Sequence, residues 1–237
     1  MMRIERPFAV RIARILDGAS RKVADEVRMI GASASPGVIL MDLERELLEV
    51  FQPAYRQTID VFGSRILRAF KSHSGYETKA EDVFSVEAER WIRTTAAEKV
   101  KQVSDTTKRK ISAAIEFGFG DSLTGSQVAN EIMSRTGGAI AKSRAIVISR
   151  TEIHMAAGHG SQLAAESTGI PLKKVWISAS DERTRETHSD ADARYHADPI
   201  ALKDSFTVGG DSMEQPGGGS DPAENINCRC VSSYVPE

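Results

Sequence analysis

Two thiols placed one residue apart are the clearest candidates for chemistry in this sequence. Cys228 and Cys230 lie in the segment NINCRC and are the only cysteines among the 237 residues. In an extended segment, residues i and i+2 point to the same side, so both sulfurs would face one way. A disulfide between residues so close in the chain would be strained. Two thiolates on one face suit Zn²⁺, which takes four nitrogen, sulfur or oxygen ligands in a tetrahedron.

A zinc site would need further ligands, and the segment upstream of the cysteines supplies candidates. His188 is the best of them, because it lies on a short predicted helix that follows an apolar strand. Asp181, Asp192 and His196 are the candidates for a fourth ligand. The alternative is a pair of half-buried thiols in a final strand, with His188 bonded to a backbone group. The residue types leave both alternatives open.

Acids, arginines and histidines also gather on two predicted helices. In ISRTEIHMAAGHG, Glu152 and His159 share a helix face, an arrangement that suits acid–base chemistry or metal binding and more often serves packing and ion pairing. In DERTRETH, Asp181 has the position of a helix cap and can pair with Arg185 at i, i+4, while Arg183 lies on another side. A metal-dependent hydrolase or nuclease therefore stays open, although the zinc-protease motif HExxH is absent.

The elements that must position these residues are mostly helices. Apolar residues recur every three or four positions over residues 8–27 and again over about residues 38–71, which predicts two long amphipathic helices. The segment GASASPG separates them, and Pro53 predicts a kink or a break inside the second. Residues 71–79 are expected to form a linker.

Further helices are expected after that linker. Thr78 and Thr124 each begin a capping-box pattern, and Ser104 or Asp105 is placed to cap another helix between them. The last helix of the series should run over about residues 140–168.

The pattern changes after residue 170. LKKVWIS alternates like a strand, DSFTVGGDSM has a hairpin signal at Gly209-Gly210, and CRCVSSYV predicts a last strand. These short strands need a surface to pack on, so we expect them to lie against the long helix before them with Trp176 buried. The predicted fold class is α+β and mainly helical. The expected regions are a helical arm, a second helical region and a small α+β module, over residues 1–75, 76–169 and 170–237.

Composition is that of an ordinary soluble protein. The net charge of −2 gives no general attraction to nucleic acid or to membranes. No apolar run approaches the roughly 20 residues that a membrane-spanning helix needs. The first residues lack the apolar core of a secretory signal, and two cysteines cannot build a disulfide framework. We therefore expect the chain to be cytoplasmic when it is made.

Taken in order, separated segments of the chain resemble the phage Mu protein F-like family, the minor head or head-morphogenesis proteins of tailed phages. The segments include SRAIVISRTEIHMAAGHG, KVWISASDERTRETH, FTVGGDSMEQPGGG and NINCRCV, and the resemblance covers about residues 100–237. The chain departs from the family at SDADARYH, where a glycine often follows the motif histidine, and at PGGGSDP, where the usual loop is shorter. Carried over residue by residue, the family pattern falls on Arg150, Thr151, Glu152, Trp176, Asp181, Arg183, Thr184, Arg185, His188, Phe206, Pro216, Asn227, Cys228, Arg229 and Cys230.

The resemblance implies a virion component present in few copies, which acts with the portal in head assembly or in the packaging and passage of DNA. Its partners would be portal and head proteins, and contact with DNA is left open. Its location would be the host cytoplasm during assembly and then the virion head. The apolar stripes of residues 1–75 are expected to dock on the portal or on a neighbouring head protein.

The resemblance does not imply catalysis, although related modules are sometimes fused to toxin enzymes. One alternative is a toxin-like, metal-dependent hydrolase or nuclease built on the same C-terminal residues. The other is a helical adaptor that acts outside any virion.

Overall fold

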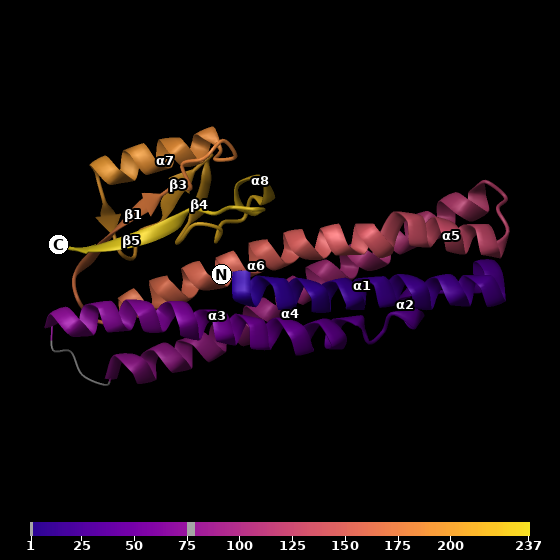
Figure 1. The fold of residues 1–237 in the computed structure, drawn as a ribbon, viewed down its shortest axis with the longest axis horizontal. Coiled ribbons are helices and arrows are strands. Elements are labelled where there is room, and N and C mark those ends of the chain that lie inside the picture. The colour runs from indigo at the N-terminus through magenta and orange to yellow at the C-terminus, as the bar shows by residue number, and fades with distance from the viewer. Residues whose placement is uncertain (1, 75–78) are drawn as a thin grey trace. The chain divides into compact units, whose positions relative to one another are not determined.

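A computed structural model describes residues 2–74 and 79–237, in which long helices are followed by a small module with strands (Figure 1). The predicted fold class, α+β and mainly helical, is confirmed. Of the expected linker, residues 71–74 belong to a helix, and residues 75–78, with the predicted cap Thr78, lie outside the described residues. The helices before the module are α1 (Met2–Ile30), α2 (Pro36–Ile39), α3 (Leu43–Ser74), α4 (Lys79–Gly120), α5 (Gly125–Thr136) and α6 (Gly138–Ser167), with the 3₁₀ turn η1 (Gly31–Ser33) after α1.

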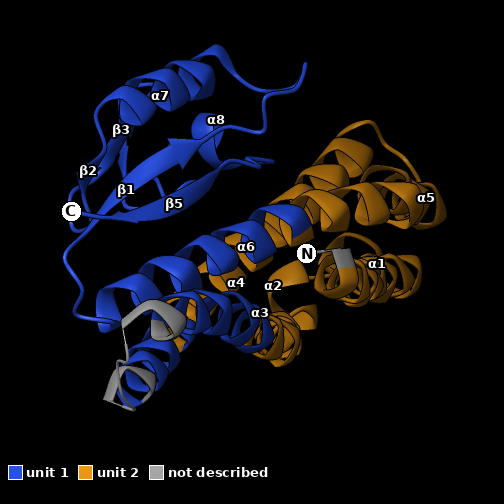
Figure 2. Cartoon of the chain, turned by 60° about the vertical axis from the view of Figure 1, so that its left-hand side comes forward, with its two compact units in different colours: residues 1, 55–92, 150–237 blue, residues 2–54, 93–149 orange. Residues whose placement is uncertain are grey.

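The chain divides into two compact units, each assembled from segments far apart in the sequence (Figure 2). Unit 1 contains residues 55–92 and 150–237, and unit 2 contains residues 2–54 and 93–149. The unit boundaries therefore fall inside α3, α4 and α6. The three regions expected from the sequence do not follow this division, because the apolar stripe of α1 packs along the distant helix α5. Their independence as folding units stays a prediction.

The core of unit 2 uses the apolar stripes that the sequence predicts. Phe8 and Ile12 of α1 are buried, and the ring of Phe8 meets that of Phe51 edge-on at 5.0 Å. Helix α5 opens with the predicted capping box, in which Thr124 and Gln127 exchange hydrogen bonds between side chain and backbone. These two signals are local in sequence, and both are confirmed.

The helix bounds test two expected interruptions. Helix α3 runs through Pro53 without a break, and a kink there stays a prediction; α4 continues past Ser104 and Asp105, so the helix start expected there is wrong. Ser104 is buried inside α4 together with the apolar residues Val100 and Ile111. Packing of a continuous buried face supplies most of a helix's stability in a protein, and it outweighs a local capping signal.

The C-terminal module is part of unit 1. Strand β1 (Leu172–Ile177) pairs antiparallel with β2 (Ile200–Ala201) on one side and with β5 (Val231–Pro236) on the other. β3 (Phe206–Val208) and β4 (Asp211–Met213) form the predicted hairpin, and the φ angles of +59° and +86° at Gly209 and Gly210 suit such a turn. Helix α7 (Glu186–Ala197) packs on β1 and β3, and the short helix α8 (Pro222–Asn225) precedes the cysteines.

The module rests on the C-terminal half of α6, as expected. The side-chain amide of Gln162 donates a hydrogen bond of 2.7 Å to the carbonyl of Leu202. Gly158 lies against Gln215, where a Cβ would come within 3.0 Å of its side chain. Trp176 is fully buried, which confirms the expectation for that residue.

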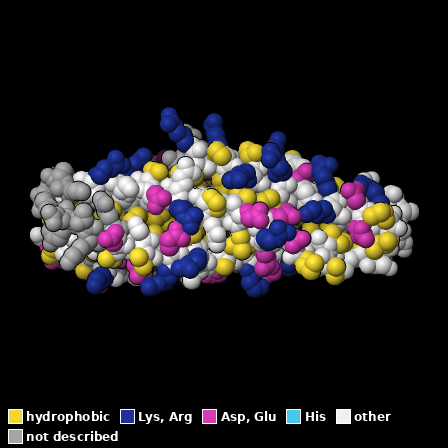
Figure 3. Space-filling model, turned by 90° about the horizontal axis from the view of Figure 1, so that it is seen from below, with side chains coloured by type: hydrophobic (Ala, Val, Ile, Leu, Met, Phe, Trp, Pro, Cys, Tyr) yellow, Lys and Arg dark blue, Asp and Glu magenta, His cyan; other side chains and the backbone are white. Residues whose placement is uncertain are grey.

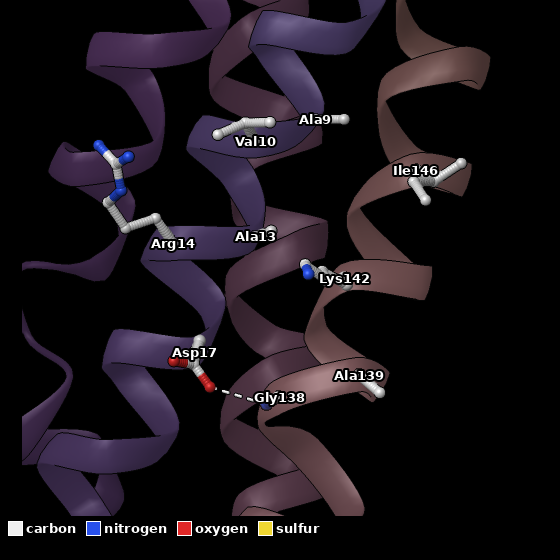
Figure 4. Close-up of a pocket in the computed structure, with 9 residues that line it drawn as sticks. All are labelled: Ala9, Val10, Ala13, Arg14, Asp17, Gly138, Ala139, Lys142 and Ile146. Atoms are coloured by element: carbon white, nitrogen blue, oxygen red, sulfur yellow. Dashed lines mark hydrogen bonds between the residues drawn. The ribbon is translucent and has the colours of Figure 1, made fainter.

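Unit 2 carries an apolar groove of about 590 Å³ between the first half of α1 and the start of α6 (Figure 4). The small side chains of Ala9, Ala13 and Ala139 leave the room for it. Val10 and Ile146, which are 57% and 47% exposed, add apolar surface to its walls. The groove is therefore an apolar surface that no described residue covers.

Charges of both signs are intermixed with apolar side chains on the face of the molecule shown in Figure 3. Such mixing agrees with the small net charge. Among the described residues, no helix combines the length and the apolar character needed to cross a membrane.

Candidate metal centre

A buried cluster of one imidazole and two thiols lies inside the module. His188 is in the first turn of α7, and Cys228 and Cys230 lie in the segment between α8 and β5. The expectation that the cysteines belong to the last strand is wrong, because β5 begins only after them. The chain turns at Asn227, whose φ is +59°, and then brings both sulfurs inward. None of the three side chains is more than 2% exposed.

The ligand atoms of the cluster are in contact. Nδ1 of His188 lies 3.2 Å from Sγ of Cys230 and 3.8 Å from Sγ of Cys228. Both cysteines are free thiols. The structure therefore brings together the three residues that the sequence singles out, while the binding of a metal by them stays a prediction.

Aromatic rings surround the cluster and fix the imidazole. The ring of Trp176 on β1 stands edge-on to that of His188 at 5.4 Å, and edge-on to that of Phe206 at 5.3 Å. The two cysteines belong to the same buried core as these rings. The core of the module is thus built around the thiols.

Glu224 of α8 holds the far side of the imidazole. Its Oε2 lies 2.9 Å from Nε2 of His188 and also accepts a 2.9 Å hydrogen bond from the hydroxyl of Thr187. Sequence reasoning missed Glu224, because the segment SDPAEN is predicted as a loop and no periodic pattern marks this residue. Its place shortly before Cys228 is the one signal that could have pointed to it.

The two thiols differ in their pKa. The hydrogen bond from Cys228 lowers the pKa of Cys230 to about 5 against the opposing effect of burial, and the imidazole of His188 lowers it further. The same hydrogen bond, together with burial, raises the pKa of Cys228. Cys230 is therefore the more acidic thiol of the pair, and the thiolate is the form that binds metals.

The three residues predicted as a fourth ligand have other partners. Asp181 pairs with Arg229 at 2.6 Å, and this hydrogen bond lowers the pKa of Asp181 to about 2. Asp192 accepts hydrogen bonds from the backbone N–H and the hydroxyl of Ser178 at 2.9 and 2.6 Å. Its other oxygen lies 2.8 Å from Nδ1 of His196. Within the described residues, the cluster of ligand atoms does not include Asp181, Asp192 or His196.

The segment before α7 differs from the expectation. The helix begins at Glu186, and the side chain of Asp181 instead accepts a hydrogen bond from the backbone N–H of Arg183 in a preceding turn. Arg185 donates a 2.6 Å hydrogen bond to the carbonyl of Ile226. This arginine therefore ties the start of α7 to the loop that carries the cysteines.

The Arg-Thr-Glu motif of α6, residues 150–152, also contacts the loop that carries the cysteines. The hydroxyl of Thr151 accepts a hydrogen bond of 3.2 Å from the backbone N–H of Asn227, and Arg150 donates one of 3.4 Å to its side chain. Glu152 is buried and accepts a hydrogen bond from the hydroxyl of Tyr55 on α3. Sequence reasoning missed Tyr55, since a contact between two distant helices leaves no local pattern.

Comparison with protein families matches residues 64–233 to the family described as phage Mu protein F like protein. Minor head protein GP7 of Bacillus phage SPP1 is 30% identical over 128 residues, which are 53% of this chain and 40% of that protein. NAD(+)-arginine ADP-ribosyltransferase EFV of Enterococcus faecalis is 32% identical over 71 residues, which are 30% of this chain and 14% of that protein. The chain thus spans less than half the length of these two relatives. No solved structure matches.

Proposed function

Because the chain belongs to the phage Mu protein F like family, we propose that it is a minor head protein of a tailed phage or prophage and acts in head morphogenesis. The observation that carries the proposal is the family match over residues 64–233, which includes the whole cysteine–histidine cluster and the motif of α6. The similarity to a phage minor head protein supports the same role. In this role the chain would be made in the host cytoplasm and carried into the virion head.

The groove of unit 2 supplies a surface for the portal protein, the partner that we assign to it. Its walls are apolar, and Arg14 and Lys142 add two exposed cations beside it. The acid at its end, Asp17, is already engaged by the backbone N–H of Gly138 at 2.7 Å and by Arg21. An apolar helix flanked by acidic residues would fill such a groove and complement its charge.

The proposal is tested in the phage or prophage that encodes the chain. Quantitative mass spectrometry of purified virions should find the chain in few copies per head. A nonsense mutation in its gene should yield defective or non-infectious heads, and a wild-type copy should restore them. Normal, infectious heads that lack the chain would overturn the proposal. A portal gene immediately upstream is also expected, and its absence would favour the adaptor alternative.

The proposed role includes no enzymatic activity. The stretch that matches this chain is only 14% of the length of the ADP-ribosyltransferase. The activity of that protein is therefore not assigned to this chain. Purified protein should show no cleavage of DNA, RNA or peptides with Zn²⁺, Mg²⁺ or Mn²⁺, and no transfer from NAD(+) to arginine. Metal-dependent turnover that is lost in His188→Ala, in a variant that melts like the wild type, would favour the hydrolase alternative.

A further inference from the structure

The spacing of the three ligand atoms in the cluster already approaches that of a zinc site. With bonds of about 2.3 Å to sulfur and 2.0–2.1 Å to nitrogen, tetrahedral Zn²⁺ holds neighbouring ligand atoms about 3.6–3.8 Å apart. The two distances from Nδ1 of His188 to the sulfurs are 3.2 and 3.8 Å, and all three atoms lie within 4.8 Å of one another. Shifts of a few tenths of an ångström would therefore suffice to place a metal between them.

The far side of the imidazole has the partner that metal-bound histidines require. The tautomer of His188 that binds a metal carries its proton on Nε2, where it donates to Glu224, and its lone pair on Nδ1, the nitrogen that lies against the two sulfurs. A carboxylate in this position fixes the ring and raises the basicity of the nitrogen that binds the metal. Glu224 is itself held by Thr187 and buried. Gly209 leaves room for it, since a Cβ there would lie 2.2 Å from its carboxylate.

A small cavity borders the cluster. Besides the cluster, Thr184 and Arg185 are among the residues that line it, and its volume is about 10 Å³. That volume is about the size of one water molecule. Many catalytic zinc sites also have three protein ligands and one water. A substrate would need a larger cleft, however, and a cavity of about 10 Å³ has no room for one.

We infer that His188, Cys228 and Cys230 bind Zn²⁺, with Glu224 as the positioning residue of the imidazole and a single water as the fourth ligand. The metal joins α7 to the loop between α8 and β5, and so closes the module around Trp176. Two thiolates balance the charge of Zn²⁺ inside this buried site. The inference does not depend on the head-protein proposal, because its test measures metal content and stability.

The first test uses the full-length protein without substitutions. Purified without chelators from zinc-supplemented cells, it should contain about one equivalent of zinc by elemental analysis. A chelator should lower its melting temperature, and added Zn²⁺ should restore it. Replacement by Co²⁺ should give the thiolate charge-transfer and visible bands of a tetrahedral site. Less than about a tenth of an equivalent of zinc, with no response of melting to chelator or to Zn²⁺, overturns the inference.

The second test separates the ligands from the positioning residue. Cys228→Ser should abolish binding of Zn²⁺. Glu224→Gln should weaken it by about 10–100-fold while leaving the stoichiometry at saturating Zn²⁺ unchanged. Asp192→Asn is the matched control, because this carboxylate also pairs with a histidine but lies outside the cluster. Affinity unchanged in Glu224→Gln, or lowered equally in Asp192→Asn, would overturn the assignment of Glu224.

Discussion

His159 makes the stability of unit 1 sensitive to acid. Its ring stacks on that of Trp91 at 4.3 Å, and burial lowers the pKa of His159 to about 4. In the unfolded chain a histidine has a pKa near 6.5, so between these values the unfolded state binds a proton that the folded state does not. The free energy of unfolding should therefore fall by up to about 1.4 kcal/mol per pH unit as the pH drops from about 6.5 towards 4.

Urea unfolding of the wild type and of His159→Gln at pH 7, 6 and 5 measures this effect. The variant should lose stability less steeply, because it removes the buried base. His196→Gln is the control for removing a histidine, since that side chain is 60% exposed and lies outside the stacked pair. Equal slopes for His159→Gln and the wild type would contradict the prediction.

At the residue scale, the sequence predicted the parts of the site that carry their chemistry in their residue type. Cysteine and histidine are residue types that bind metals, so the order of Cys228, Cys230 and His188 along the chain was enough to single them out. Among the described residues, the predicted fourth ligands do not join the cluster; the carboxylate of Asp181 is taken by Arg229, an ion pair that only the folded chain reveals. The role of Glu224 likewise depends on the path of a loop.

Helices α3 and α6 approach each other closely within unit 1 because a glycine lies at the contact. A Cβ on Gly160 would lie 2.9 Å from Cα and 3.0 Å from the carbonyl oxygen of Ile59, and backbone cannot move aside as a flexible side chain can. Gly160→Ala should therefore destabilise the protein by about 1–3 kcal/mol. Thermal melting and urea unfolding measure the change.

Gly18 offers the matched control on α1. A Cβ there meets nothing within 4 Å, so Gly18→Ala should stabilise the helix by about 0.5–1 kcal/mol through its effect on backbone entropy. If Gly18→Ala raises the stability and Gly160→Ala lowers it, the loss of stability is assigned to the contact between α3 and α6. A loss of similar size at both positions would count against it.

At the element scale, signals confined to a few residues predicted structure well. The capping box at Thr124 and the hairpin at Gly209-Gly210 depend on neighbours in the sequence, and both are present. The helix start at Ser104 failed, because burial against other segments keeps α4 continuous there. The start of β5 was placed too early, since pairing with β1 decides where the strand begins.

At the scale of the whole molecule, an amphipathic stripe does not predict which segment of the chain will pack against it. The sequence predicted apolar faces over residues 8–27 and about 38–71, yet it held no sign that residues 2–54 would join residues 93–149 in one unit. Such long-range pairing is set by the sum of many packing contacts. The division into two units therefore became visible only in the folded chain.

The groove of unit 2 gives a prediction for the assembled head. Val10→Asp combined with Ile146→Asp places two charges on its exposed apolar walls, so the chain should fold normally and enter virions poorly. Val38→Asp is the control, because Val38 is 69% exposed and does not line the groove. Mass spectrometry of virions and melting of the purified variants give both readouts. Wild-type incorporation of the double variant would rule out the groove as the docking surface.

The sheet order of the module has a consequence during biosynthesis. β1 forms its long ladder with β5, and Ile177 meets Val231 only after the whole segment between them has been made. At about 5–20 residues per second, a ribosome takes about 3–11 s to make that segment. For those seconds the nascent chain presents an apolar strand and Trp176 without the residues that later cover them. Misassociation of newly made chains should begin at β1. It should end once β5 and the segment between α8 and β5 have packed on β1.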